Sequence, residues 1–167
     1  MSKLFVDDIV EKTSGHGVQI PGHMVQIVQG ISTTYTSLGS TGTYVDTNLA
    51  ATITPKFASS KILATLHAPI VYRNTEDAIL RLLRGSTNVY QMNLWSGSTN
   101  GGYGMVTGSF QFLDSPSTTS ATTYKVQMAT EGSGNTGTCF INSSGEDSDN
   151  NQHGRYASSI TVMEVAG

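Results

Sequence analysis

The segment KILATLHAPIVY, residues 61–72, decides the fold class of this chain. Every second residue in it is apolar, and side chains alternate between the two faces of a β-strand. One face of a long strand would therefore carry Ile62, Ala64, Leu66, Ala68, Ile70 and Tyr72. The same alternation returns at Val106, Gly108, Phe110 and Phe112, at Tyr124, Val126 and Met128, and at Ile160 and Val162. The pattern predicts antiparallel strands with one buried face.

Further strands are expected at residues 24–36, which contain Val25, Ile27 and Ile31, and in the last run, 156–165. Residues 77–84 fit a short helix or a strand, and we predict a strand because the neighbouring segment reads as one. Clusters rich in Gly, Ser, Asn and Asp separate these runs at 38–42, 96–102, 114–117, 131–137 and 142–151. Many short strands with such turns predict an all-β sandwich or jelly roll.

The first 22 residues differ from the rest of the chain. The candidate anchoring residues among them are the apolar Leu4, Phe5, Val6, Ile9, Val18 and Ile20. A turn at 13–17 would fold them into a small hairpin, which cannot bury enough surface to be stable alone. We therefore expect an arm, residues 1–22, that anchors the chain or clasps another subunit, followed by one domain over residues 23–167.

Composition narrows the function classes. Charged residues make up 13% of the 167 residues, the net charge is −3, and Cys139 is the single cysteine. An ordinary chain has roughly 25% charged residues. Scarce and scattered basic residues argue against nucleic acid as a partner. No apolar run reaches membrane-spanning length, so we expect no membrane partner, and the chain is expected to be soluble and made in a reducing cytoplasm.

Several segments resemble one family, the fibre-type virion proteins of phages, especially marine phages. They are KLFVDDIVEKTSGHGVQIPGHMVQ (3–26), ITPKFASSKIL (53–63), LRLLRGST (80–87), FLDSP (112–116) with TTYKV (122–126), and SITVMEV (159–165). The resemblance implies a protein on the virion surface, a homotrimer, and a head similar to the tumour-necrosis-factor jelly roll. Long tail fibres usually carry an extended shaft, whereas this chain has only a short arm, which favours a capsid decoration protein, a head fibre or a small fibre tip.

Catalysis has little support in the sequence. It contains no nucleophile elbow and no phosphate-binding loop. Cys139 lies in an apolar run, GTCFI, where a buried structural cysteine is expected rather than a nucleophile. A polysaccharide depolymerase would need two facing carboxylates, and most acids here fall in predicted turns or in the arm. We therefore expect a protein that is not an enzyme and needs no cofactor.

Two loops are candidate ligand contacts. Trp95 and Tyr103 flank a stretch rich in Ser, Gly and Asn, and rigid aromatic rings beside such residues suit recognition of a protein or a sugar. Asp147, Asp149 and Asn151 begin like a calcium loop, but Gln152 stands where Gly is required. The alternatives are aromatic rings packed in the core and a solvated acidic loop.

No metal site is expected. His16 and His23 lie near turns without a neighbouring ligand, so polar turn histidines are the simpler interpretation, although either could repeat around a trimer axis.

Two functions remain open from the sequence. The first is a structural virion protein, a homotrimeric decoration or short fibre protein that is assembled in the host cytoplasm and attached to capsid or tail proteins through its arm. The alternative is a fibre tip that recognises a host surface glycan or protein through its loops.

Overall fold

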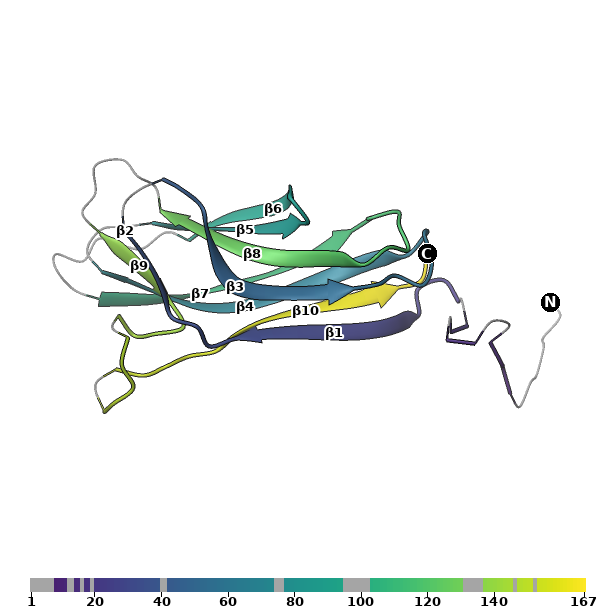
Figure 1. Cartoon of the computed structure of the whole chain (residues 1–167), viewed down its shortest axis with the longest axis horizontal. Coiled ribbons are helices and arrows are strands. Elements are labelled where there is room, and N and C mark those ends of the chain that lie inside the picture. Colours follow the sequence, from purple (N-terminus) through teal and green to yellow (C-terminus); the bar gives the residue numbers. More distant parts are fainter. Residues whose placement is uncertain are drawn as a thin grey trace.

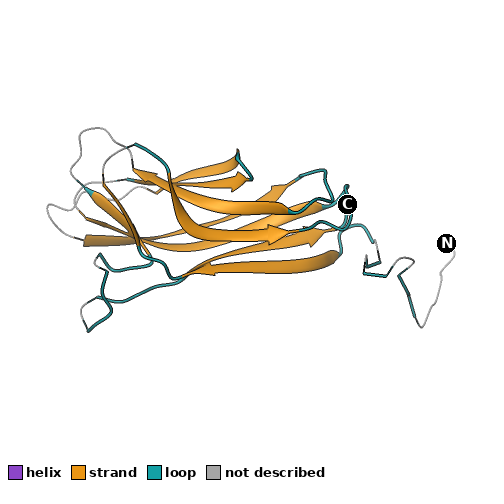
Figure 2. Cartoon of the chain, in the orientation of Figure 1, coloured by secondary structure: helices purple, strands orange, loops and turns teal. Residues whose placement is uncertain are grey.

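The computed structural model describes residues 8–11, 14–15, 17–18, 20–39, 42–73, 77–94, 103–130, 137–145, 147–151 and 153–167. These residues form ten strands and no helix, which confirms the predicted all-β class (Figure 2). The strands are β1 (Met24–Ser32), β2 (Thr36–Gly39), β3 (Val45–Ile53), β4 (Lys61–Arg73), β5 (Ala78–Arg84), β6 (Thr87–Leu94), β7 (Tyr103–Asp114), β8 (Thr122–Thr130), β9 (Thr138–Ile141) and β10 (Ser158–Val165).

The strands form two antiparallel sheets that pack face to face (Figure 1). Sheet A contains β1, β2, β4, β7, β9 and β10, and sheet B has the order β3-β8-β5-β6. In sheet A, β7 pairs with one edge of β4 along its length, while β10 and β9 share the other edge. β1 pairs with β10 and β2 pairs with β9, so β1 and β2 follow one another along the outer side of β10 and β9.

The line formed by β10 and β9 is interrupted, and this explains a proline in the central strand. The carbonyl of Pro69 accepts a hydrogen bond from the N–H of Asn142 at 3.5 Å. In an antiparallel ladder the nitrogen and carbonyl of one residue face the same neighbour. The nitrogen of Pro69 therefore faces the gap where residues 142–157 leave the sheet, and no donor is lost there.

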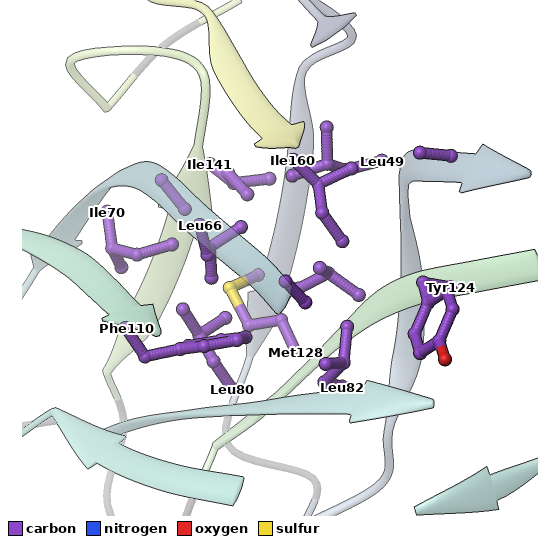
Figure 3. Packing of buried hydrophobic residues seen from close by; sticks show 14 of the residues in the cluster. Leu49, Leu66, Ile70, Leu80, Leu82, Phe110, Tyr124, Met128, Ile141 and Ile160 are labelled. Atoms are coloured by element: carbon purple, nitrogen blue, oxygen red, sulfur yellow. The ribbon is translucent and has the colours of Figure 1, made fainter. Parts of the chain in front are cut away.

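The core lies between the sheets and follows the predicted alternation. Ile62, Ala64, Leu66, Ala68 and Ile70 are buried on one face of β4, and Tyr124, Val126 and Met128 of β8 belong to the same core cluster. Leu66, Ile70, Tyr124 and Met128 are labelled in Figure 3. Lys125 and Gln127 point to the other face of sheet B, as the alternation predicts. Each fully buried Ile or Leu side chain stabilises the fold by about 1.5–3 kcal/mol.

The two edges of the sandwich close differently. At one edge β1 crosses close to β3, where a Cβ on Gly30 would overlap the carbonyl of Ala50. At the other edge the ring of Tyr90 on β6 packs against Phe110 and Phe112 on β7, with ring centroids 4.6 and 5.5 Å apart. A glycine therefore closes one edge and an aromatic cluster closes the other.

Two buried polar clusters tie the layers together. At the end of β7, Asp114 accepts hydrogen bonds from Arg84 at 2.8 Å and from the hydroxyl of Tyr124 at 2.6 Å. Burial, followed by this hydrogen bond, raises the pKa of Tyr124. On β10, the fully buried carboxylate of Glu164 accepts hydrogen bonds from the backbone N–H of Lys56 at 2.7 Å and from the side-chain amide of Gln26 at 2.6 Å.

The structure corrects some predicted boundaries. The expected early strand, 24–36, is broken at 33–35 into β1 and β2, and the last strand begins at Ser158 rather than at Tyr156. Of the segment 77–84, residues 78–84 form a strand, β5, as predicted. The described arm residues belong to no strand, so a strand through Ile9 is wrong. The arm has no sheet partner among the described residues that would hold it extended.

Candidate interaction surfaces

The strand order sorts the connections into two groups. The arm, the C-terminus and the turn between β3 and β4 lie at one end of the sandwich, here called the arm end (Figure 1). β2, β4, β6 and β8 end, and β3, β5, β7 and β9 begin, at the opposite end, here called the distal end. Candidate contacts therefore fall into separate regions of the molecule.

The arm is fastened to the C-terminus. The N–H of Gly22 donates to the carbonyl of Ala166, and the N–H of Ala166 donates to the carbonyl of His23, both at 2.8 Å. Gly22 has a φ of 84°, a conformation that favours glycine, and the N–H of His23 donates back to the carbonyl of Ile20 at 2.9 Å. These bonds fix the point and direction at which the arm leaves the sandwich.

A carboxylate organises the turn in the arm. The two carboxylate oxygens of Glu11 accept hydrogen bonds from the N–H groups of Gly15 and Gly17, each at 2.7 Å. Both glycines have positive φ values, 80° and 76°. The turn predicted at 13–17 is thus held by a side chain at position 11, which sequence reasoning did not assign.

The arm exposes apolar side chains. Ile9 is 62% exposed and Val10 is 82% exposed, and Val18 is also exposed, whereas Ile20 is partly buried. The described parts of the arm lie beyond the end of the sandwich rather than on either sheet (Figure 1). Leu4, Phe5 and Val6 lie outside the described residues. In a single chain, adjacent apolar side chains at 9 and 10 remain in water.

The outer face of sheet A carries a continuous line of apolar side chains, here called the apolar row. Its members are Ile27, Met163, Leu63 and Leu113, and the strand register places them directly side by side across β1, β10, β4 and β7. Ile27 is 54% exposed and Leu113 is 49% exposed, while the two central members are partly buried. Met24 and Val165, paired with each other, lie beside the row towards the arm end.

Polar side chains bound the apolar row on its other side. The next line across the same four strands is Gln29, Thr161, Thr65 and Gln111. Gln29 donates to the hydroxyl of Thr161 at 3.1 Å. An apolar strip with a polar border resembles the arrangement of protein interfaces, in which an apolar centre is surrounded by a polar rim.

Sequence reasoning missed the apolar row. In β4, β7 and β10 its residues lie on the face opposite the buried residues, and such out-of-phase apolar residues are the signal that could have identified them. The lateral alignment itself depends on the register between strands distant in sequence.

The distal end brings together some of the predicted contact residues. Tyr103 is exposed on the outer face of sheet A, with the guanidinium of Arg73 5.7 Å from its ring centroid. A Cβ on Gly145 would lie 2.5 Å from the ring, so the 142–157 segment packs against Tyr103. Asp147 forms an ion pair with Arg155, and Asp149 and Asn151 are exposed. Trp95 lies outside the described residues.

Residue Asn142 fixes the start of the 142–157 segment. Its side-chain amide donates to the carbonyl of Thr34 at 3.0 Å and accepts from the hydroxyl of Ser158 at 2.5 Å. The two ends of the segment are thus joined, because Ser158 is the first residue of β10. Asp147 and Asp149 therefore lie in a loop whose two ends are held together.

A polar cluster on the outer face of sheet B was not predicted. The guanidinium of Arg81 lies 3.6 Å from the ring centroid of Tyr44 and donates to Gln127 at 2.6 Å. Gln127 donates in turn to Asp46 at 2.6 Å. This bond, together with the ammonium of Lys125, holds the pKa of Asp46 below its usual value.

A cavity of about 180 Å³ adjoins this cluster where β3 bulges, and it is lined by Asp46, Asn48, Leu49, Ala50, Lys125 and Val126. Asn48 has a φ of 58°. The buried hydroxyl of Thr47, a residue in the bulge, donates a hydrogen bond to the carbonyl of Val126 at 2.8 Å.

The residues considered for metal binding or catalysis are dispersed. Within the described ranges, no three His, Cys, Asp or Glu side chains gather as a metal site would require. His23 is exposed near the arm, and His16 lies outside the described residues. Cys139 is fully buried in β9. Among the described residues, no helix is long and apolar enough to cross a membrane.

Comparisons with known proteins give distant structural likenesses. No family model matches the chain, and no curated protein matches it. A structure of infectious bursal disease virus, Gt strain, aligns with a TM-score of 0.40 and 12% identity over 98% of this chain and 43% of that one. The VP2 subviral particle of the same virus gives 0.38 and 13% over 85% and 38%. The chain spans less than half of these proteins, and at such scores the likeness carries no argument about function.

Proposed function

We propose that this chain is a structural protein on the exterior of a phage particle, a homotrimeric decoration or short fibre protein that attaches through its N-terminal arm. The observation that carries the proposal is the arm itself. It is anchored by two backbone hydrogen bonds to the C-terminus at one end of a packed sandwich, and it presents Ile9 and Val10 to solvent. Apolar side chains that the chain leaves uncovered are typical of a segment that binds another subunit.

The charged groups support a structural role over an enzymatic one. Buried Glu164 bonds the backbone of the β3–β4 turn, and Asp114 bonds Arg84 and Tyr124. Asp46 bonds Gln127 and lies beside Lys125. These carboxylates are occupied by contacts that hold the fold, whereas a glycosidase needs two carboxylates facing a substrate.

Deletion of residues 1–22 tests attachment. Particles assembled without this protein are mixed with the purified full chain or the truncated chain and then sedimented, and bound protein is quantified. We expect the full chain to sediment with the particles and the truncated chain to stay in the supernatant. Circular dichroism of the truncated chain serves as the folding control. Equal binding of the two chains would contradict attachment through the arm.

The trimer is tested separately by light scattering of the full chain. A mass of about three chains supports the proposal, since closed cyclic symmetry gives every arm a neighbouring chain to bind without producing filaments. A monomer at all accessible concentrations would contradict it.

A second candidate is a fibre tip that binds a host surface glycan or protein. It is favoured by the distal end, where exposed Tyr103 lies against the 142–157 segment with its acidic residues. Aromatic and polar side chains on a fixed base form an adaptable contact surface. Substitution of Trp95, Tyr103 or Asp147 by alanine should then reduce binding of labelled protein to host cells. Unchanged binding in all three variants would count against this function.

A further inference from the structure

We infer that the apolar row of one copy is the docking surface for the arm of a second copy. This inference rests on the self-assembly in the proposed function and names the surface that receives the arm. Both surfaces leave apolar side chains in water in the single chain: the arm exposes Ile9 and Val10, and the row exposes Ile27 and Leu113. Contact between them would remove Val10 and the exposed members of the apolar row from water.

The dimensions of the two elements agree. Neighbouring strands lie about 4.8 Å apart, so a row across four strands is roughly 15 Å long. An extended chain advances about 3.3 Å per residue, so roughly five residues cover that length. In the sequence, residues 6–10, Val-Asp-Asp-Ile-Val, provide a stretch of this length, and Val6 and Val10 would share one face of it if it were extended.

Charge favours the same pairing. In the sequence, Ile9 and Val10 are flanked by Asp7, Asp8 and Glu11. Lys61, one ladder position from the apolar row, is exposed on the outer face of sheet A, and the described strand residues that point outward on this face include no carboxylate. An acidic segment would meet a face of neutral and basic side chains.

The position of the arm favours a second copy over the same chain. The arm leaves at the bonds from Gly22 to Ala166, and its described residues lie beyond the end of the sandwich (Figure 1). The row of the same chain remains exposed. One arm and one row per copy allow each copy to give and receive one contact, which a closed ring satisfies completely.

Crosslinking between two differently tagged chains tests the inference. A tagged chain with Val10→Cys is co-expressed with an untagged chain with Leu113→Cys, and a short thiol-reactive crosslinker is added. We expect a covalent heterodimer. Ser109→Cys is the matched control because Ser109 is exposed on the same face of β7, four residues from Leu113. The wild-type chain controls for Cys139, which is buried.

The outcomes separate the possible arrangements. At least a fivefold excess of heterodimer with Leu113→Cys over Ser109→Cys supports docking on the apolar row. Equal yields, or no heterodimer, overturn it. A chain that carries both Val10→Cys and Leu113→Cys and crosslinks only within itself also overturns it, because the arm then covers its own row.

A second variant distinguishes this inference from the proposed function. Leu63→Ser with Leu113→Ser should reduce the solution mass of the full chain to that of a monomer, while circular dichroism remains that of a folded sandwich. The particle assay reports attachment independently. Heterodimer formation without particle binding would support the docking and contradict the proposed function, and particle binding by a full chain that forms no heterodimer would do the reverse.

Discussion

At the scale of single residues, the hydroxyl of Tyr124 shows how a buried polar group depends on its partner. The side chain is fully buried, and its hydroxyl donates to Asp114 at 2.6 Å. Asp114 also binds Arg84, so sheet A and sheet B are linked at the arm end of the sandwich. Burial disfavours the phenolate and the Asp114 carboxylate disfavours it further, which is why the pKa of Tyr124 is raised.

The raised pKa predicts a loss of stability in alkali. Below pH 10 Tyr124 is protonated in both states, and its contribution to stability is fully present. Above about pH 10 the tyrosine of the unfolded chain ionises while the folded one stays protonated, so the free energy of unfolding falls. At pH 8, Tyr124→Phe should cost roughly 1.5–3 kcal/mol, the value of a hydrogen bond to a charged group.

Urea denaturation of wild type and Tyr124→Phe at pH 8 and pH 11 measures both effects. The difference between the two proteins should shrink at the higher pH. Tyr103→Phe, which removes an exposed hydroxyl, is the control and should track wild type at both values. A constant difference for Tyr124→Phe would refute the assignment.

Glu164 provides a second prediction at this scale. Both of its oxygens accept hydrogen bonds, one from the backbone of the β3–β4 turn and one from Gln26. In Glu164→Gln one of these oxygens becomes a donor, and a buried donor then faces another donor. The free energy of unfolding should fall by roughly 1–3 kcal/mol. Amide hydrogen exchange at Lys56 and Phe57 should accelerate, whereas exposed Asp46→Asn should leave that turn unchanged.

At the scale of elements, the crossing of β1 over β3 depends on one glycine. A Cβ on Gly30 would overlap the backbone carbonyl of Ala50, and a backbone atom cannot move aside as a flexible side chain can. Gly30→Ala should destabilise the fold by roughly 1–3 kcal/mol or more, as overpacked cores do. Gly39→Ala is the matched control in β2, because nothing lies within 4 Å of its added Cβ. Equal midpoints in urea for both variants would show that the edge is not packed as described.

Alternation predicted the long strands well, and the reason is physical. β4, β7, β8 and β10 each have one face in the core, so residues such as Leu66, Phe110 and Val126 recur with a period of two. The segment 77–84 also proved to be β5, although its composition suits a helix. A central strand obtains partners on both sides, here β6 and β8, and tertiary pairing outweighs local propensity.

Other features were hidden because they depend on distant residues. In β1 the apolar Ile27 and Ile31 face outward, while Gln26 and Gly30 face inward against Glu164 and Ala50. The break at 33–35 matches the departure of residues 142–157 from the neighbouring line. The sequence around Pro69 does not indicate the gap that its nitrogen faces. The sequence around Asn48 does not indicate the bulge in β3. The register that forms the apolar row is likewise set by pairing between strands far apart in sequence.

At the scale of the whole molecule, the predicted contact residues fall at opposite ends. Tyr103, Asp147, Asp149 and Asn151 belong to the distal end, and the arm residues Ile9, Val18 and Ile20 belong to the arm end. Sequence reasoning set residues 1–22 apart as an arm because their pattern differs from the rest of the chain, and an anchoring role for them stays a prediction. It could not identify the apolar row, because that surface forms only when four strands are aligned.

Self-association predicts that stability depends on concentration. If the native state contains several chains, mass action favours it at higher protein concentration. The midpoint of thermal unfolding of the full chain should rise by roughly 2–4 °C for each tenfold increase in concentration, a shift expected for a chain of this size. The chain lacking residues 1–22 should show a constant midpoint. Calorimetry over a hundredfold range is sufficient, and a constant midpoint for the full chain would contradict assembly.

The joined ends of the 142–157 segment have a consequence for engineering. Asn142 and Ser158 are held together by a hydrogen bond of 2.5 Å, and the nitrogen of Pro69 opposite them needs no hydrogen-bond partner. The sheet is therefore complete without the intervening residues, and their number is not fixed by the ladder. A foreign peptide exchanged for residues 146–152 would be presented as a loop with a fixed base, at the end of the molecule opposite the arm, which makes this segment a natural insertion point for epitope display.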